Sequence, residues 1–463
     1  MPGDIDSLAG SAEAIAAGSV SSVELVSRAL DRAERAQPSL NAFRELYPER
    51  ALHAAARADA QRAAGRAAPL LGVPVGIKDD MDLDGAPSRH GCAGNFHPRQ
   101  YSSESVRRLE SAGAIIIGKT NLPEFGQWPF TEGVFGSTRN PWNLRHTPGG
   151  SSGGSASAVS AGIVHGALGS DGAGSVRIPA AWTGLVGIKP HRGRLSTAPD
   201  DSPFYGLTCF GPLARTVGDA ALLLTAATGG DDLFPTTIRV ALQRRDPGRL
   251  RVGLSLNPPF SGYTVRLHPD VRRAVERIAY TLDGLGHEVV PIDAPYRLMG
   301  VGFLPRSLRG IADLSRTVPD IELLDPRTRA NARIGELLPS LATEFATISE
   351  GIARRRFSQV FKTVDVLLTP TTATAPPEVG SFDDLSNAET DRQMIAAAPY
   401  CWPWNVLGWP AVNIPAGLTP SGLPVGAQLL GASRSEPLLV ELAAQLEGLE
   451  QWQLRRPPAA QGA

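Results

Sequence analysis

Two glycine- and serine-rich segments carry hydroxyl groups that could act as nucleophiles. Residues 149–155 read GGSSGGS, and residues 169–179 read GSDGAGSVRIP. Glycine lets the backbone take a positive φ and approach another group closely, so each segment can present its serines on a tight loop. A flexible linker would have a similar composition, but a run of small and apolar residues, 156–168, separates the two segments. We therefore expect two supported loops whose serines take part in catalysis.

A lysine at the end of an apolar run is a candidate base for such a serine. Residues 71–80 read LGVPVGIKDD, which places Lys78 where a strand entering the core would normally end in a neutral residue. Burial disfavours the charged form of a lysine, and a neutral amine can accept a proton from a hydroxyl group. Lys78 could thus be the base that activates a serine of the two loops.

The first loop also fits a second kind of serine site. Residues 149–153 match G-x-S-x-G, a pattern whose serine works with a histidine base and an acid later in the chain. None of the later histidines stands in a distinctive loop; they are His165, His191, His268 and His287. This alternative is weaker but stays open at the level of sequence.

Metal and nucleotide chemistry are not expected. The eight histidines never pair at i, i+4 with a glutamate between them, so no helix offers two ligands of a metal site. Residues 113–120, GAIIIGKT, match the P-loop pattern G-x-x-x-x-G-K-[ST]. The residues between these glycines are mostly β-branched and favour a strand, whereas a P-loop places a phosphate-binding loop there. We expect no cofactor and no metal.

Hydrophobic periodicity indicates which elements position these residues. It predicts helices at about residues 22–35, 51–64, 102–112, 216–228, 269–285 and 436–447. Short apolar runs predict strands at residues 71–77, 114–117, 184–190, 250–254, 287–292 and 364–370, with a closing strand pair at 411–417 and 422–428. Strands separated by helices along the whole chain are typical of an α/β fold whose central sheet is covered on both faces.

The chain is long enough for a large core. Its 463 residues, 42% of them hydrophobic, fit one large domain or two. We expect a single domain over residues 1–463, with a variable helical segment at about 295–358 that covers the active-site edge. The aromatic stretch 122–142 is either a satellite of the core or one wall of an apolar pocket.

Composition limits which partners the protein could bind and in which cellular compartment it could reside. The formal net charge of -1 argues against a surface that binds nucleic acid. Three widely separated cysteines indicate neither a disulfide framework nor a zinc knuckle and fit a reducing compartment. Residues 1–6 lack the basic and apolar regions of a signal peptide, and no apolar run approaches 18 residues. We expect a cytoplasmic protein that does not bind a membrane.

Taken together, the motifs resemble the amidase signature family. The resemblance rests on residues 72–79, 149–155 and 171–179 and covers most of the chain, being weak only from about 235 to 360. It implies an α/β fold with a central mixed, mostly parallel twisted sheet. It also implies a serine amidohydrolase that cleaves linear amide C–N bonds through an acyl-enzyme, with an oxyanion hole and no cofactor.

Carried over by position, the resemblance implies a Ser-Ser-Lys catalytic triad. Ser175 would be the nucleophile, and Ser151, after a cis peptide bond, would relay protons to Lys78. The two serines are 24 residues apart, since 175 minus 151 is 24, which is the separation in the family. Ser152 would support this relay.

The resemblance also implies an oxyanion hole and a loop support. The backbone N–H groups of Gly172, Ala173, Gly174 and Ser175 would bind the oxyanion, and Asp171 and Arg177 would pair to hold the loop. Small residues suit this role because the substrate carbonyl must come within hydrogen-bond range of the main chain. Ala173 departs from the family, which usually has glycine there.

The sequence says less about the substrate and the partners than about the reaction. The substrate could be an aliphatic amide, an aryl amide, a carbamate or an ester. Aromatic residues near the loops favour an apolar or aromatic small-molecule amide; they are Trp128, Phe130, Tyr400, Trp402 and Trp404. A homodimer is compatible with the sequence.

The alternative function within the family is the A subunit of a glutamyl-tRNA amidotransferase. Two features argue against it. Ile178 stands where many such proteins have glutamine, and residues 126–129, GQWP, replace their Met-Gly-Ser-Ser run.

Overall fold

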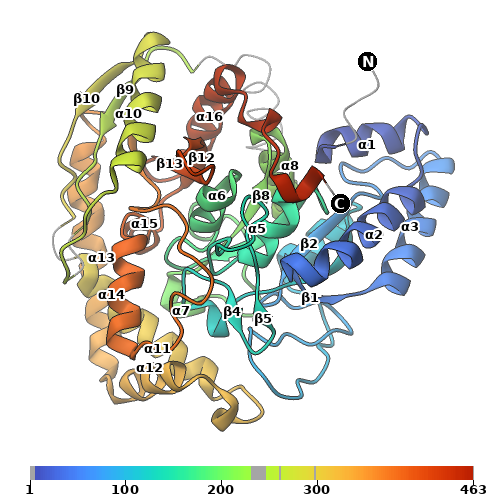
Figure 1. Cartoon of the computed structure of the whole chain (residues 1–463), viewed down its shortest axis with the longest axis horizontal. Coiled ribbons are helices and arrows are strands. Elements are labelled where there is room, and N and C mark those ends of the chain that lie inside the picture. Colours follow the sequence, from blue (N-terminus) through green and yellow to red (C-terminus); the bar gives the residue numbers. More distant parts are fainter. Residues whose placement is uncertain (1–5, 231–246, 260–261, 297–298, 462–463) are drawn as a thin grey trace.

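In the part of the chain that the structure describes, one 11-stranded sheet runs from β1 on the right of Figure 1 to β10 on the left. The computed structural model describes residues 6–230, 247–259, 262–296 and 299–461 of the chain. In order of pairing, the strands are β1 (Phe43–Leu46), β3 (Ile115–Thr120), β2 (Pro74–Lys78), β6 (Gly166–Asp171), β8 (Cys209–Ala214), β7 (Val186–Lys189), β12 (Ala411–Leu418), β13 (Pro424–Leu430), β11 (Val366–Pro370), β9 (Arg251–Leu254) and β10 (Glu288–Pro291).

Both faces of the sheet are covered, as predicted. Successive strand residues point to opposite faces: Ile116 of β3 belongs to one hydrophobic cluster, whereas Ile115 and Ile117 belong to another. The first cluster includes residues of α1 (Leu8–Ala16), α4 (Glu104–Ser111), α8 (Val217–Thr228), α10 (Pro269–Gly284) and α16 (Glu436–Glu450). The second includes residues of α2 (Ser22–Leu40), α3 (Pro48–Ala63), α5 (Gly153–Ser160) and α6 (Arg177–Thr183). The α/β fold class is confirmed.

The sheet is mixed, as predicted, but the expectation that it is mostly parallel is wrong. Parallel pairing joins β3, β2 and β6 at one end and β11, β9 and β10 at the other. Every pairing from β6 through β8, β7, β12 and β13 to β11 is antiparallel, and so is the β1–β3 pairing. A short connection is the physical reason in one case, because residues 419–423 are too few to return the chain for a parallel strand.

Local sequence signals account for most elements. Ser21 caps α2, since its side chain accepts from the backbone N–H of Glu24. The run 156–168 divides between the end of α5 and the start of β6. β3 includes Lys119 and Thr120, so residues 113–120 form a strand with its flanks rather than a P-loop, as predicted.

Further helices lie in the left part of Figure 1. They are α7 (Pro203–Gly206), α11 (Leu304–Ser315), α12 (Pro326–Leu337), α13 (Ser340–Val360), α14 (Asn387–Ala397) and α15 (Trp402–Leu407). A short two-stranded sheet comprises β4 (Glu132–Gly133) and β5 (Gly136–Ser137). Within the described ranges, no helix is both long and apolar enough to cross a membrane.

Candidate active site

Lys78 is the last residue of β2 and is fully buried. Its strand lies between β3 and β6 and is therefore covered by a neighbour on each side. Its ammonium nitrogen Nζ lies 2.7 Å from Ser151 Oγ and 2.7 Å from Ser170 Oγ. Asp80 Oδ2 lies 3.3 Å from the same nitrogen. Lys78 therefore contacts the serine predicted to be its partner.

Burial acts on the charge of this lysine. It lowers the pKa of Lys78 from its ordinary value, while the neighbouring Asp80 carboxylate acts in the opposite direction. The neutral amine is thus easier to reach than in an exposed lysine, and only that form can accept a proton.

Ser151 follows a cis peptide bond. The bond joins Gly150 to Ser151, as the family resemblance implied. The segment is tightly enclosed, because a Cβ atom at Gly150 would lie 2.5 Å from the carbonyl oxygen of Trp128. Ser151 is itself buried, and its contact with Lys78 rather than a histidine removes the support for the histidine-dependent alternative.

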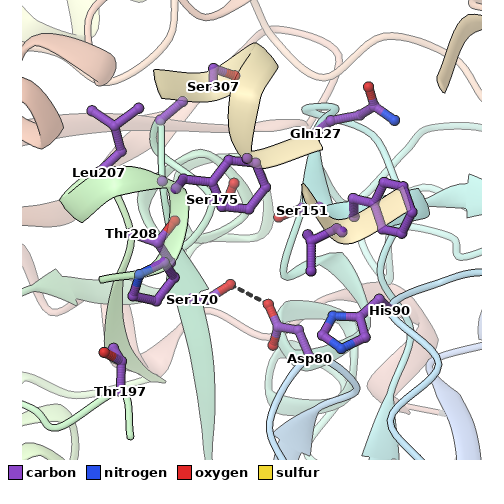
Figure 2. Close-up of a pocket in the computed structure, with 18 of the residues that line it drawn as sticks. Asp80, His90, Gln127, Ser151, Ser170, Ser175, Thr197, Leu207, Thr208 and Ser307 are labelled. Atoms are coloured by element: carbon purple, nitrogen blue, oxygen red, sulfur yellow. Dashed lines mark hydrogen bonds between the residues drawn. The ribbon is translucent and has the colours of Figure 1, made fainter. Parts of the chain in front are cut away.

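Ser175 lies on the loop between β6 and α6, and its side chain is 7% exposed. Ser151, Ser170 and Ser175 all line one cavity (Figure 2). The two serine loops are joined by their backbones, since the N–H of Ser152 donates to the carbonyl of Ser175 over 3.0 Å. Ser152 Oγ also donates to the carbonyl of Ser170, so Ser152 connects the two loops.

The predicted oxyanion donors divide into two kinds. Within the described chain, the backbone N–H groups of Gly172, Ala173 and Ser175 have no acceptor, and these three residues line the cavity. The N–H of Gly174 donates instead to Asp171 Oδ1 over 2.8 Å. The inclusion of Gly174 among the donors is therefore not supported, because the Asp171 carboxylate already uses its N–H group.

Gly174 has a different reason to be glycine. Its φ is +122°, and a Cβ atom there would lie 2.5 Å from Cys401 Cβ. The loop can therefore follow this path only without a side chain at position 174.

Asp171 and Arg177 form the predicted pair. Both side chains are fully buried, and two parallel contacts of 2.9 Å join the guanidinium to the carboxylate. Burial by itself would raise the pKa of Asp171, but the Arg177 guanidinium outweighs it and holds that pKa well below its ordinary value. Arg177 also donates to Gln428 and Asn405, which fixes the start of α6 against β13 and α15.

Sequence reasoning missed three residues of the site. Ser170 Oγ contacts Lys78 Nζ and donates to Asp80 Oδ2 over 2.5 Å, so the carboxylate, the hydroxyl and the amine form one network. Gly126 leaves room for this network, because a Cβ atom at position 126 would lie 2.9 Å from Ser151 Oγ. Ser170 directly precedes Asp171, and Asp80 follows Lys78 by two positions. Their place beside these predicted site residues was the sequence signal that could have indicated them.

The cavity has a volume of about 720 Å³ and is lined largely by aromatic and aliphatic side chains. Of the five aromatic residues predicted near the loops, Trp128 and Trp402 line it. The other three pack elsewhere: Phe130 stacks on Phe382, Trp404 packs against Phe357, and the Tyr400 hydroxyl donates to the carbonyl of Leu256.

The stretch 122–142 contributes only its first half to the wall. Phe125 and Trp128 line the cavity, whereas Trp142 donates through its ring N–H to the carbonyl of Thr183. Helix α11 and the residue before it supply the facing wall, through Phe303, Ser307, Gly310, Asp313 and Leu314. Among the described residues, no group of three or more His, Cys, Asp or Glu side chains could hold a metal ion.

Comparison with known proteins identifies the family. The model of the Amidase family matches residues 24–440. The chain belongs to the Amidase family. As a member of that family it is an amidohydrolase that acts on C–N bonds, which confirms the predicted reaction class.

Three relatives illustrate the match to the Amidase family. The protein named "Putative amidase AmiA2" of Mycobacterium tuberculosis is 50% identical over 96% of this chain and 93% of its own length. A solved structure of 6-aminohexanoate cyclic dimer hydrolase with its substrate has a TM-score of 0.88 and 28% identity, over 99% of this chain and 100% of that one. The A subunit of the glutamyl-tRNA(Gln) amidotransferase of Synechococcus sp. is 36% identical over 96% of each chain, and is thus more distant than AmiA2.

Proposed function

We propose that this enzyme hydrolyses a carboxylic amide through an acyl-enzyme on Ser175. The observation that carries the proposal is the 2.7 Å contact between Lys78 Nζ and Ser151 Oγ beside a cavity that Ser175 also lines. A buried amine, a bridging hydroxyl and a cavity-facing hydroxyl are the parts that a lysine-activated serine needs.

The proton path follows from this order of groups. Neutral Lys78 accepts the proton of Ser151, and Ser151 accepts that of Ser175 as Ser175 Oγ bonds to the amide carbonyl carbon. The tetrahedral intermediate collapses with cleavage of the C–N bond, and the proton returns through Ser151 to the leaving amine. Water then attacks the ester on Ser175 by the same relay and releases the acid.

The negative charge that develops on the substrate's carbonyl oxygen needs hydrogen-bond donors that are not already engaged with another acceptor. The N–H groups of Gly172, Ala173 and Ser175 meet this requirement, and each such donor contributes about 3 kcal/mol to stabilising the transition state. Ala173 keeps its N–H although it replaces a glycine of the family, and its methyl group narrows the space above the loop.

The cavity wall favours an apolar substituent on the substrate. Phe125, Trp128, Phe303 and Trp402 surround it, so an aryl amide fits better than a small polar amide, and a related carbamate or ester could also be accepted. We propose this class of substrate without assigning one compound.

Two further expectations belong to this proposal. The strands from β1 to β13, apart from β4 and β5, share one sheet, which supports a single domain with the segment 295–358 placed against the cavity. All three cysteines are free and buried, which supports a reducing, cytoplasmic environment.

Replacement of the nucleophile tests the proposal. Ser175→Ala should lower kcat for an anilide substrate at least about 1000-fold, because it removes the hydroxyl that forms the ester in this mechanism. Ser307→Ala, which also removes a hydroxyl from the cavity wall, should keep nearly all activity. Hydrolysis by Ser175→Ala at a rate close to that of the unmodified enzyme would remove the assignment.

A further inference from the structure

Helix α13 exposes a stripe of large apolar side chains. Leu341, Phe345, Ile348 and Ile352 are 69%, 60%, 65% and 43% exposed. The opposite side of the helix is buried, through Ala346, Glu350, Ala353 and Phe357. The helix lies at the left edge of the molecule in Figure 1. No residue of α13 lines the cavity, so substrate binding does not account for the stripe.

The spacing of the stripe is that of a helix–helix seam. The four residues follow one another at intervals of four, three and four, which is the a/d pattern of a coiled coil. Polar or small residues flank them, such as Glu344, Thr347 and Ser349. A helix lying on a membrane needs a wider apolar face, whereas this narrow stripe suits a second helix that inserts side chains between its own.

The charges along α13 indicate how that second helix would run. Glu344 lies in the first half of the helix, and Arg355 and Arg356 lie near its end, all three exposed. A copy of the same helix running antiparallel would bring the acidic half of each helix toward the basic half of the other. It would also oppose the two helix dipoles, which a parallel arrangement would not.

We propose that α13 is a dimer interface at which two copies of this chain pair their α13 helices antiparallel about a two-fold axis. The symmetry covers both stripes at once, since the same surface of each copy contacts the other. Phe345 and Ile348 stand in the middle of the stripe, so they lie closest to the axis and carry most of the contact. The cavities stay open to substrate in this arrangement, because their lining residues are not part of the seam.

Sedimentation of the full-length enzyme at micromolar concentrations tests this interface. The unmodified chain should sediment as a dimer, and the double variant F345E/I348E should sediment as a monomer, with a dissociation constant raised at least about 100-fold. Tyr280→Glu, at a 79% exposed apolar position on α10 outside the stripe, should leave the dimer intact. Amide hydrolysis by F345E/I348E at the unmodified rate would establish that this variant folds.

Charge reversal tests the antiparallel arrangement separately. Glu344→Arg should weaken the dimer about tenfold by opposing like charges, and E344R/R355E/R356E should restore it. A monomeric unmodified chain, a dimer that survives F345E/I348E, or binding of monomers to phosphatidylserine vesicles through the stripe would each overturn the proposal. None of these outcomes depends on the role of Ser175.

Discussion

At the scale of single residues, Asp80 is the group that most affects the proposed base. Its carboxylate lies 3.3 Å from Lys78 Nζ, and Ser170 bridges the two. Burial lowers the pKa of Lys78, and Asp80 limits that lowering. The pH at which the amine becomes neutral therefore depends on burial and on this carboxylate, with Asp171 acting in the same direction as Asp80.

This dependence predicts a shifted pH profile. In the unmodified enzyme, kcat/KM should rise as pH rises through the pKa of Lys78, because the neutral amine is the working form. Asp80→Asn removes the charge that raises this pKa, so the rising limb should move to lower pH by roughly 1 to 3 units. The measurement is kcat/KM against pH for both proteins.

Asp82→Asn is the matched control. Asp82 also lines the cavity, but it pairs with Arg99 over 3.0 Å rather than with Lys78, so its loss should not move the profile. A profile of Asp80→Asn that superimposes on the unmodified one, or that moves to higher pH, would contradict the role given to Asp80.

The apolar run before Lys78 and the glycine-rich segments around the serines could be noticed from the sequence, but the separate roles of Ser151 and Ser175 came from the family resemblance. Asp80 and Ser170 lie beside those motifs, but a sequence does not tell which way a loop side chain turns. The same holds for Gly174, whose N–H direction depends on where the Asp171 carboxylate lies.

At the scale of elements, the buried Asp171–Arg177 pair joins the end of β6 to the start of α6 and so fixes the loop that carries Ser175. Removal of one partner leaves the other charge buried without compensation. Arg177→Met should therefore lower the free energy of unfolding by about 3 to 5 kcal/mol, measured by urea denaturation.

Two further variants make this test specific. Arg28→Met breaks an ion pair on α2 whose side chains are 47% exposed, and it should cost about 1 kcal/mol or less. The double variant D171N/R177M should recover part of the stability lost in Arg177→Met, since no lone charge remains. A cost for Arg177→Met equal to that of Arg28→Met would contradict the role of the pair.

The existence of the elements could be predicted more fully than their arrangement. Apolar runs located β3, β9 and β11, and hydrophobic periodicity located α2, because these signals depend on neighbours in sequence. Strand direction depends on connections that cross the molecule. That is why the antiparallel centre of the sheet was not foreseen.

At the scale of the whole molecule, the cavity brings together segments that are distant in sequence. The serine loops supply one side, and Phe303 and α11 supply another. Phe303 also packs against Trp402, with ring centroids 5.5 Å apart. The apolar wall thus exists only in the assembled fold.

This wall predicts substrate preference. Phe303→Ala should raise KM for an anilide about tenfold while changing KM for a short aliphatic amide little, because only the aryl group loses contact. Phe345→Ala, on α13 and outside the cavity, should change neither value. Equal effects of Phe303→Ala on both substrates would argue against an aromatic subsite.

Aromatic residues near the loops could be named from sequence, but their assignment to the cavity could not. Trp128 and Phe130 belong to one apolar cluster, and Trp402 and Trp404 belong to another. Only Trp128 and Trp402 also line the cavity. Whether an aromatic side chain lines the cavity depends on the packing of elements that are distant in sequence, such as the packing of α13 against α15.

Peptide mapping after reaction with a fluorophosphonate tests the proposed site most directly. The probe forms a P–O bond with the activated hydroxyl and loses fluoride, so its position identifies the nucleophile. We predict one adduct, localised to Ser175 by fragmentation of the peptide 146–177, its loss in Ser175→Ala, and slow labelling in Lys78→Ala. An adduct on Ser151 or another serine, or full labelling of Ser175→Ala, would contradict the assignment of Ser175 as the acylated residue.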